Sequence, residues 1–250
     1  MSSDSATRRR VSDRNIAFMR DLERRFQRAT GLRNRAVYKI YYCEIHRAPI
    51  LTLGLNPGGN PSHMNSNGRT MKSGFVACAS ARYHENGRHD LLDCEWKENH
   101  GLREILAPLL GGDPKRIRDE VVKTNVAFRR SAKKADIDIV AAIGEAEPFL
   151  AEIIAHVKPV LILLTGVPIL DFLKRHATRF EQIGRTQKAR AINQVVFAAA
   201  RARLRRTSRV TLVVQVAHAS RFAWTYKRYN VAQRTFNLLE TSTNAGAISK

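Results

Sequence analysis

Apolar and polar residues follow one another in blocks along this chain, and the blocks predict buried strands separated by amphipathic helices. The most distinct blocks are short apolar runs that each stop in a polar loop. Such runs are typical of parallel strands buried on both faces. We expect strands at 50–54, 120–128, 160–166 and 210–217. Val37–Cys43, which is β-branched and aromatic, predicts a further strand or the approach to one.

Between the strands, apolar positions recur at helical spacing. Ile16, Met19, Leu22 and Phe26 are a clear series, and Gly31 after them predicts a helix C-cap. We expect helices at 13–30, 102–110, 145–156, 169–176, 189–205 and 229–239. Strands that alternate with helices predict a parallel sheet with right-handed crossovers. The expected fold class is therefore α/β, a three-layer α/β/α architecture with a central, mainly parallel four-stranded sheet.

The pattern predicts a single domain over 13–240, because no internal repeat and no Pro/Ser/Gly-rich linker interrupts it. Residues 1–12 are small, polar and charged and are expected to be a disordered basic N-terminal tail, while 241–250 would be a C-terminal tail. The polar segment 60–99 contains one apolar patch, Gly74–Cys78. Loops of that length in a compact domain are usually functional.

The chain is strongly basic, and this favours a polyanionic partner. It carries 43 Lys and Arg against 22 Asp and Glu, a formal net charge of +21. Charge alone leaves DNA, RNA and an anionic membrane open. The stretch Arg175–Arg209 is especially basic and is interpreted either as a phosphate-binding face or as a solvated basic helix.

Several classes of protein are disfavoured. Cys43, Cys78 and Cys94 show no CxxC spacing, which argues against a zinc site, an iron–sulfur cluster or a disulfide framework and predicts buried reduced thiols. No apolar run is long enough to cross a bilayer, and no hydrophobic region follows the N-terminal arginines as in a secretory signal. We expect a cytoplasmic protein that uses no cofactor and no metal and does not bind a membrane.

The candidate chemistry lies where the four predicted strands end. The polar ends are Gly54-Leu-Asn-Pro-Gly58, Thr124–Asn125, Thr165–Gly166 and His218–Phe222. In a parallel sheet these ends share one edge, and ligands of open α/β sheets bind there. An Asn at such a position offers both a carbonyl acceptor and an amide donor.

These loops, in this order, resemble those of the uracil-DNA glycosylase superfamily over roughly residues 45–240. That family has an early strand ending in a G-x-[DN]-P-G-like sequence, here Gly54-Leu-Asn-Pro-Gly58, and a late strand ending in an H-P-S-like sequence, here His218-Ala-Ser220. Between them it carries an Asn at a strand end, which Asn125 matches, and an apolar strand that runs into a Gly-led helix, which Val160–Gly166 matches.

The resemblance implies a base-excision enzyme that flips uracil out of DNA and hydrolyses its glycosidic bond, leaving an abasic site. Asn56 would orient the attacking water, and His218 would donate a hydrogen bond to the departing base. Asn125 would pair with the edge of the base, and Phe75 would stack on it. Gly54, Leu55, Pro57 and Gly58 would complete the base pocket. From the residues alone, Asn56 could instead cap a turn, His218 could be structural, and Phe75 could be core packing.

The resemblance also implies DNA contacts around the second motif. Phe222 lies four residues after His218, where family members insert a wedge into the space left by the flipped nucleotide. Arg221 would meet a phosphate, and Ser220 belongs to the same loop. Lys133 and Lys134, in the loop after Asn125, would flank the pocket. We expect DNA as the partner and a monomeric enzyme.

Two residues depart from the family pattern. Ala219 replaces the usual Pro, which makes the position of His218 less rigid. Gly58 stands where strict uracil enzymes carry a bulky aromatic residue that excludes a 5-methyl group, which predicts tolerance of further bases.

Two other interpretations compete with an active glycosylase. The first is a DNA- or RNA-binding module of the same fold with weak or absent catalysis, because Asn56 cannot take a proton as a carboxylate would. The second, an unrelated phosphoesterase or nucleotide-binding enzyme, is disfavoured because the chain has no G-x-x-x-x-G-K-[ST], no G-x-G-x-x-G and no carboxylate cluster for a metal.

Overall fold

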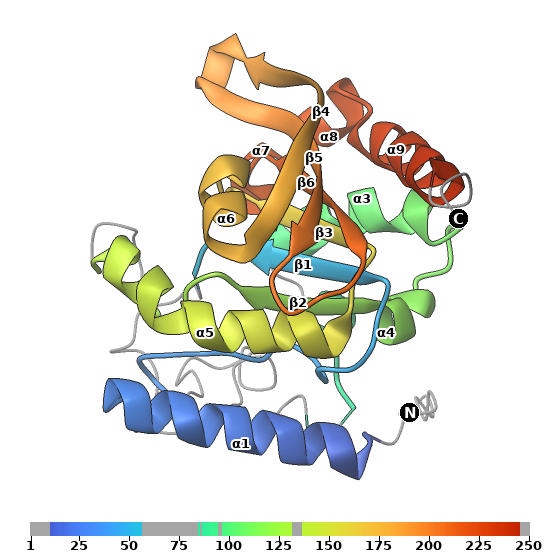
Figure 1. The fold of residues 1–250 in the computed structure, drawn as a ribbon. Coiled ribbons are helices and arrows are strands. Elements are labelled where there is room, and N and C mark those ends of the chain that lie inside the picture. Colours follow the sequence, from blue (N-terminus) through green and yellow to red (C-terminus); the bar gives the residue numbers. More distant parts are fainter. Residues whose placement is uncertain (1–10, 57–84, 86, 95–96, 132–136, 246–250) are drawn as a thin grey trace, which may run out of the picture.

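A computed structural model of the chain describes residues 11–56, 85, 87–94, 97–131 and 137–245 (Figure 1). This part of the chain is built on a six-stranded sheet with the strand order β2-β1-β3-β6-β5-β4. The strands are β1 (Ile50–Gly54), β2 (Val121–Asn125), β3 (Leu161–Thr165), β4 (Ala177–Ala189), β5 (Gln194–Leu204) and β6 (Val210–Val216). Strands β2, β1, β3 and β6 are parallel, as the sequence predicts, whereas β5 and β4 add two antiparallel strands that it does not.

The sheet is the middle of three layers, and the strand residues alternate between its two faces. Leu51, Leu53, Ile162 and Val213 pack into one core with α1 (Asp13–Thr30), α5 (Ile139–Val157) and α6 (Ile169–His176). Ile50, Leu161 and Leu212 pack into a second core with α3 (Lys97–Leu109), α4 (Arg116–Glu120) and α9 (Val231–Ala245). Three short helices complete the second layer: α2 (Asp90–Asp93), α7 (Ala219–Phe222) and α8 (Trp224–Arg228). The predicted α/β class is confirmed, whereas the expectation of a four-stranded sheet is wrong, because β4 and β5 extend the sheet to six strands.

The predicted helix at 189–205 is wrong, because this segment forms the end of β4, a short 3-10 turn at Arg190–Ile192 and most of β5. Alanine has the highest helix propensity, but propensity is a weak determinant of structure that tertiary packing overrides. Here Ala198 and Ala200 pack into the first core and Ala199 into the second, so small side chains fit on both faces of the strand. Pairing with β6 satisfies the backbone of β5.

The sequence offers a strand or the approach to one at 37–43, and the structure has no strand there, only an isolated bridge between Tyr38 and Arg129 in the segment that leads to β1. The segment is buried, and scattered contacts replace a strand ladder, such as the 2.7 Å hydrogen bond from Thr124 Oγ1 to the Ile40 carbonyl. The final helix expected at 229–239 is confirmed as α9, which begins at Val231, just after Asn230 takes a left-handed φ of 48°. Helix α9 continues to Ala245, beyond the domain boundary expected at 240, and Val11 of the expected tail is buried.

The two described cysteines differ in state. Cys43 is a free, buried thiol, as expected. Cys94 is disulfide-bonded, so the expectation of reduced thiols is wrong there. Spacing along the chain does not reveal which cysteines approach each other in space. No described helix is both long and apolar enough to cross a membrane.

Candidate active site

The four parallel strands bring their carboxyl ends to one edge of the sheet, and most of the predicted site residues meet there. Gly54 is paired with Asn125 across β1 and β2, and Thr165 is paired with Val216 across β3 and β6. Because strand β3 lies between β1 and β6, the loops carrying Asn56 and His218 lie on either side of it.

Gly54 is where the backbone of β1 passes closest to a side chain of β2. A Cβ atom at position 54 would collide with Asn125 Oδ1 and would come 3.3 Å from Glu98 Oε1. Asn125 is 4% exposed, and its Nδ2 donates a 2.7 Å hydrogen bond to the Tyr42 hydroxyl. The amide is therefore oriented, with its carbonyl oxygen toward Gly54 and Glu98.

His218 is held by the first turn that follows β6. Its Nδ1 accepts a 3.3 Å hydrogen bond from the Ser220 backbone N–H and lies 2.9 Å from Ser220 Oγ. Gly166 packs against the imidazole with a φ of 70°, and a Cβ there would come 3.0 Å from His218 Cδ2. An accepting Nδ1 requires that the proton of the neutral ring sit on Nε2.

Burial also favours the neutral form of His218. Partial burial lowers its pKa below the usual value, and the Glu98 carboxylate opposes this while Arg221 and Lys123 reinforce it. The result is a neutral imidazole with an Nε2–H donor, the form needed to stabilise a developing negative charge.

Asn56 is half-buried just after β1. Its Nδ2 donates a 2.9 Å hydrogen bond to Ser131 Oγ in the loop after β2. The neighbouring backbone is also tied to that loop, since Ala127 N donates to the Leu55 carbonyl at 2.9 Å. Leu55 itself packs against the first core. The carboxamide is thus held by a side chain from the neighbouring loop.

Glu98 is a site residue that sequence reasoning missed. It lies in the first turn of α3 and is half-buried, with Oε1 beside Gly54 and Asn125. Within the described part of the chain, its carboxylate has neither a hydrogen bond nor an ion pair. Close packing against α7 sets the position of α3. A Cβ atom at Gly101 of α3 would lie only 2.8 Å from the Ala219 carbonyl oxygen, so a glycine is needed for the two helices to come this close. No motif marks Glu98, since only this packing brings α3 to the strand ends.

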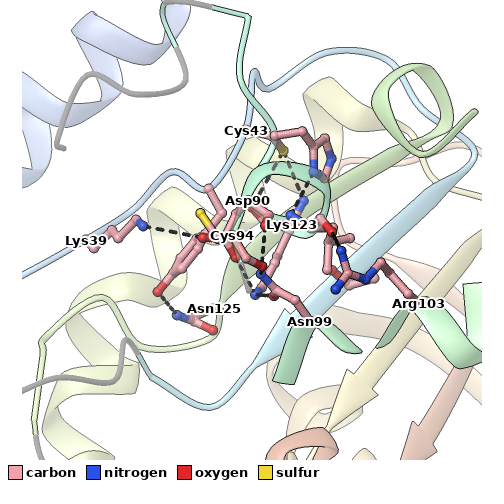
Figure 2. A network of polar contacts seen from close by, with 12 residues as sticks. Lys39, Cys43, Asp90, Cys94, Asn99, Arg103, Lys123 and Asn125 are labelled. Carbon is pink, nitrogen blue, oxygen red and sulfur yellow. Dashed lines mark hydrogen bonds and ion pairs between the residues drawn. The ribbon is translucent and has the colours of Figure 1, made fainter. Parts of the chain in front are cut away.

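A buried polar network, also missed from the sequence, lies behind Asn125 (Figure 2). Lys123 Nζ, on β2, donates to Asp90 Oδ2 at 2.8 Å and to Asn99 Oδ1 at 2.6 Å. Lys39 Nζ lies 3.9 Å from Asp90 Oδ1 and 4.1 Å from the centre of the Tyr42 ring. Although burial opposes charge on all of them, Asp90 keeps a lowered pKa and Lys123 a raised one because each faces the other. Burial prevails at Lys39 and lowers its pKa to about 7.

The remaining predicted residues fall into two groups. Arg221 is exposed, while Phe222 is half-buried against a small cluster formed by Ala189, Val196 and Ala217. The others lie outside the described residues: Pro57, Gly58, Phe75, Lys133 and Lys134. Among the described residues, no three His, Cys, Asp or Glu side chains are grouped so that they could hold a metal ion.

Comparison with known proteins does not assign the chain to a family: no protein-family model matches the sequence, and no curated protein is significantly similar to it.

Proposed function

We propose that this protein is a DNA glycosylase that flips uracil and related deaminated bases out of DNA and hydrolyses the glycosidic bond. One observation carries the proposal. Asn125 ends β2, Asn56 and His218 follow β1 and β6 at the same sheet edge, and His218 is held as an Nε2–H donor. This matches the division of labour that the resemblance to uracil-DNA glycosylases implies.

In the proposed reaction, water attacks the sugar C1′ as the bond from C1′ to the base nitrogen breaks. The bonding electrons leave with the base, and the Nε2–H of His218 stabilises the negative charge on its carbonyl oxygen. Asn125 contacts the edge of the base through its oriented amide. Asn56 positions the water, and the base anion takes a proton from solvent after release.

Glu98 supplies the proton-accepting carboxylate that Asn56 lacks. An amide cannot accept the proton that the attacking water loses, whereas a carboxylate can. Glu98 Oε1 lies beside Gly54 and Asn125 without a partner among the described residues. We assign it the role of proton acceptor, and its negative charge also stabilises the cation-like sugar.

The test is release of uracil from an oligonucleotide without added metal, with Asn56→Ala and His218→Ala beside the parent protein. We expect release by the parent and a loss of about 10²-fold or more in each variant. Equal activity in all three proteins would remove the site assignment. Duplexes containing uracil, thymine opposite guanine, hypoxanthine or xanthine measure the range of bases, which Gly58 predicts to be broad; strict uracil specificity would contradict this.

A second candidate function is a catalytically weak or silent DNA- or RNA-binding module of the same fold. The amide at position 56 favours it, because the residue that would position the attacking water cannot itself take a proton from it. Tight binding of uracil-containing or abasic DNA without any base release by the parent protein would select this function.

A further inference from the structure

The β4–β5 hairpin, which the sequence pattern does not predict, is a strongly basic arm. It projects past the rest of the sheet (Figure 1, orange, top of the view). The hairpin carries one acidic side chain, Glu181, and these basic ones: Arg179, Arg185, Lys188, Arg190, Arg201 and Arg203. All the basic side chains except Arg201 are exposed, and none of the six forms an ion pair with a described residue.

The hairpin places like charges opposite each other. Arg179 of β4 is the direct cross-strand partner of Arg203 of β5, and both are exposed. Like charges in this position destabilise a strand pair. An anion bound between them would remove the repulsion, so the arrangement favours a polyanionic ligand over bare solvent.

The far end of the hairpin is joined to the candidate active site. Phe197 of β5 pairs with Val216, the last residue of β6, so the preceding residues of the hairpin extend past the edge where His218 follows. Ala189 and Ala217 belong to one small buried cluster, against which Phe222 also packs. Lys188 and Arg190, on either side of Ala189, are exposed next to this cluster.

Helix α9 braces the same end of the hairpin. The Arg234 guanidinium donates a hydrogen bond to Gln187 Oε1 and lies 3.8 Å from the centre of the Phe197 ring. The hairpin is thus fixed to the body of the protein at the end nearest the His218 loop, and so is the backbone that carries its cations.

We propose that this hairpin is a duplex-DNA-binding arm that holds the phosphate backbone beside the flipped nucleotide. From Arg179 to Arg190 the strand spans at most about 36 Å, close to one turn of B-DNA. A braced strand that carries cations along its length suits a stiff duplex, whose phosphates recur at regular spacing, better than a flexible single strand. The assignment of DNA beside His218 rests on the proposed function, whereas the charge of the arm does not.

The test compares two triple variants of the full-length protein that lose the same charge. One is Arg185→Gln/Lys188→Gln/Arg190→Gln, at the site end of the hairpin. The control is Arg14→Gln/Arg28→Gln/Arg33→Gln, on and just after α1, where the side chains are also exposed and form no ion pair with described residues. Fluorescence anisotropy with an undamaged duplex of about 20 base pairs, across a salt series, gives the affinity and its salt dependence.

We expect the hairpin variant to bind the duplex more weakly than the parent. The slope of log K against log salt should fall by about 0.9 for each phosphate that the arm no longer neutralises, about 3 in all. The control should keep the parent's slope. Equal losses of affinity in both variants would overturn the proposal, because binding would then follow net charge alone. An equal loss of affinity for a single strand of the same sequence would overturn the preference for duplex.

Uracil release separates this inference from the proposed function. The hairpin variant should show a raised KM for uracil-containing duplex with kcat unchanged, because the arm binds DNA without touching the reacting atoms. If the parent releases no base but the anisotropy result holds, the glycosylase proposal fails and the DNA-binding arm stands. If the parent releases uracil and the hairpin variant matches it in affinity, slope and KM, the arm is excluded.

Discussion

Asn125 and Tyr42 form a 2.7 Å hydrogen bond, in which Asn125 Nδ2 donates to the phenol oxygen, and this contact decides which atom of the amide faces the candidate pocket. Both residues are buried, so neither reorients freely in solvent. The carbonyl oxygen of Asn125 is consequently presented to Gly54 and Glu98. The hydrogen bond thus connects the buried polar network to the residue proposed to recognise the base.

Tyr42→Phe should remove this orientation while leaving the packing of the ring intact. We expect a loss of about 1 kcal/mol in the free energy of unfolding and a roughly tenfold fall in kcat/KM for uracil-containing DNA. Tyr41→Phe is the matched control, because the Tyr41 hydroxyl donates to the Met19 carbonyl at 2.6 Å on α1, away from the site. It should lose similar stability without losing activity; equal activity losses would disprove the orienting role.

Gly54→Ala should displace the Asn125 amide by adding a single methyl group beside it. Its Cβ would collide with Asn125 Oδ1, so either the amide or β1 must move, and excision should fall by about 10²-fold. Gly144→Ala on α5 is the control, because nothing lies within 4 Å of its added Cβ. That variant should be unchanged in activity and stabilised by up to about 1 kcal/mol. Kinetics and urea unfolding measure both effects.

Glu98→Gln keeps the shape of the side chain and removes its charge. If Glu98 accepts the proton of the attacking water, kcat should fall by about 10²–10⁴-fold with little change in KM. Adding Asn56→Asp to this variant should restore part of the rate by supplying a carboxylate near the first motif. Glu104→Gln, an exposed position on the same helix, should have no effect. An undiminished kcat in Glu98→Gln would exclude the role.

Lys123→Met tests the buried ion pair. Removing the ammonium group leaves the Asp90 carboxylate buried at 0% exposure without its 2.8 Å partner. We expect a loss of about 3–5 kcal/mol in the free energy of unfolding, and a much smaller loss in the double variant Asp90→Asn/Lys123→Met. Urea denaturation of the single and double variants gives the coupling energy. Simple additivity would show that the two groups do not stabilise each other.

His89 should make the protein less stable in mild acid. Its Nε2 lies 2.8 Å from the Val121 carbonyl and its Nδ1 accepts from Leu91 N, so the ring is neutral, and burial lowers its pKa to about 4. The unfolded chain takes up this proton near pH 6.5, so stability is full above pH 6.5 and falls as the pH drops toward 4. His89→Gln should flatten the dependence measured by urea unfolding between pH 7.5 and 4.5; an unchanged slope would contradict this.

The sequence by itself determined the parallel half of the fold. The apolar runs at 50–54 and 160–166 have no polar alternation, so they can only be buried on both faces, and such strands require helices on either side. Helix α1 begins at Asp13 and ends at Thr30 as predicted, because Gly31 takes the left-handed conformation, φ 71°, that ends helices. Because the strands are parallel, the strand ends that carry Asn125 and His218 then lie at the same edge of the sheet.

Only the tertiary structure decided the rest. The hairpin of β4 and β5 forms because its alanines pair with β6 and pack on both faces, a gain that local helix preference cannot reveal. Glu98 and the Asp90–Lys123 pair reach the strand ends through contacts between segments that lie far apart in the chain. The order of apolar and polar residues predicts which side chains are buried. Which buried side chains contact one another depends on how the layers of the fold pack.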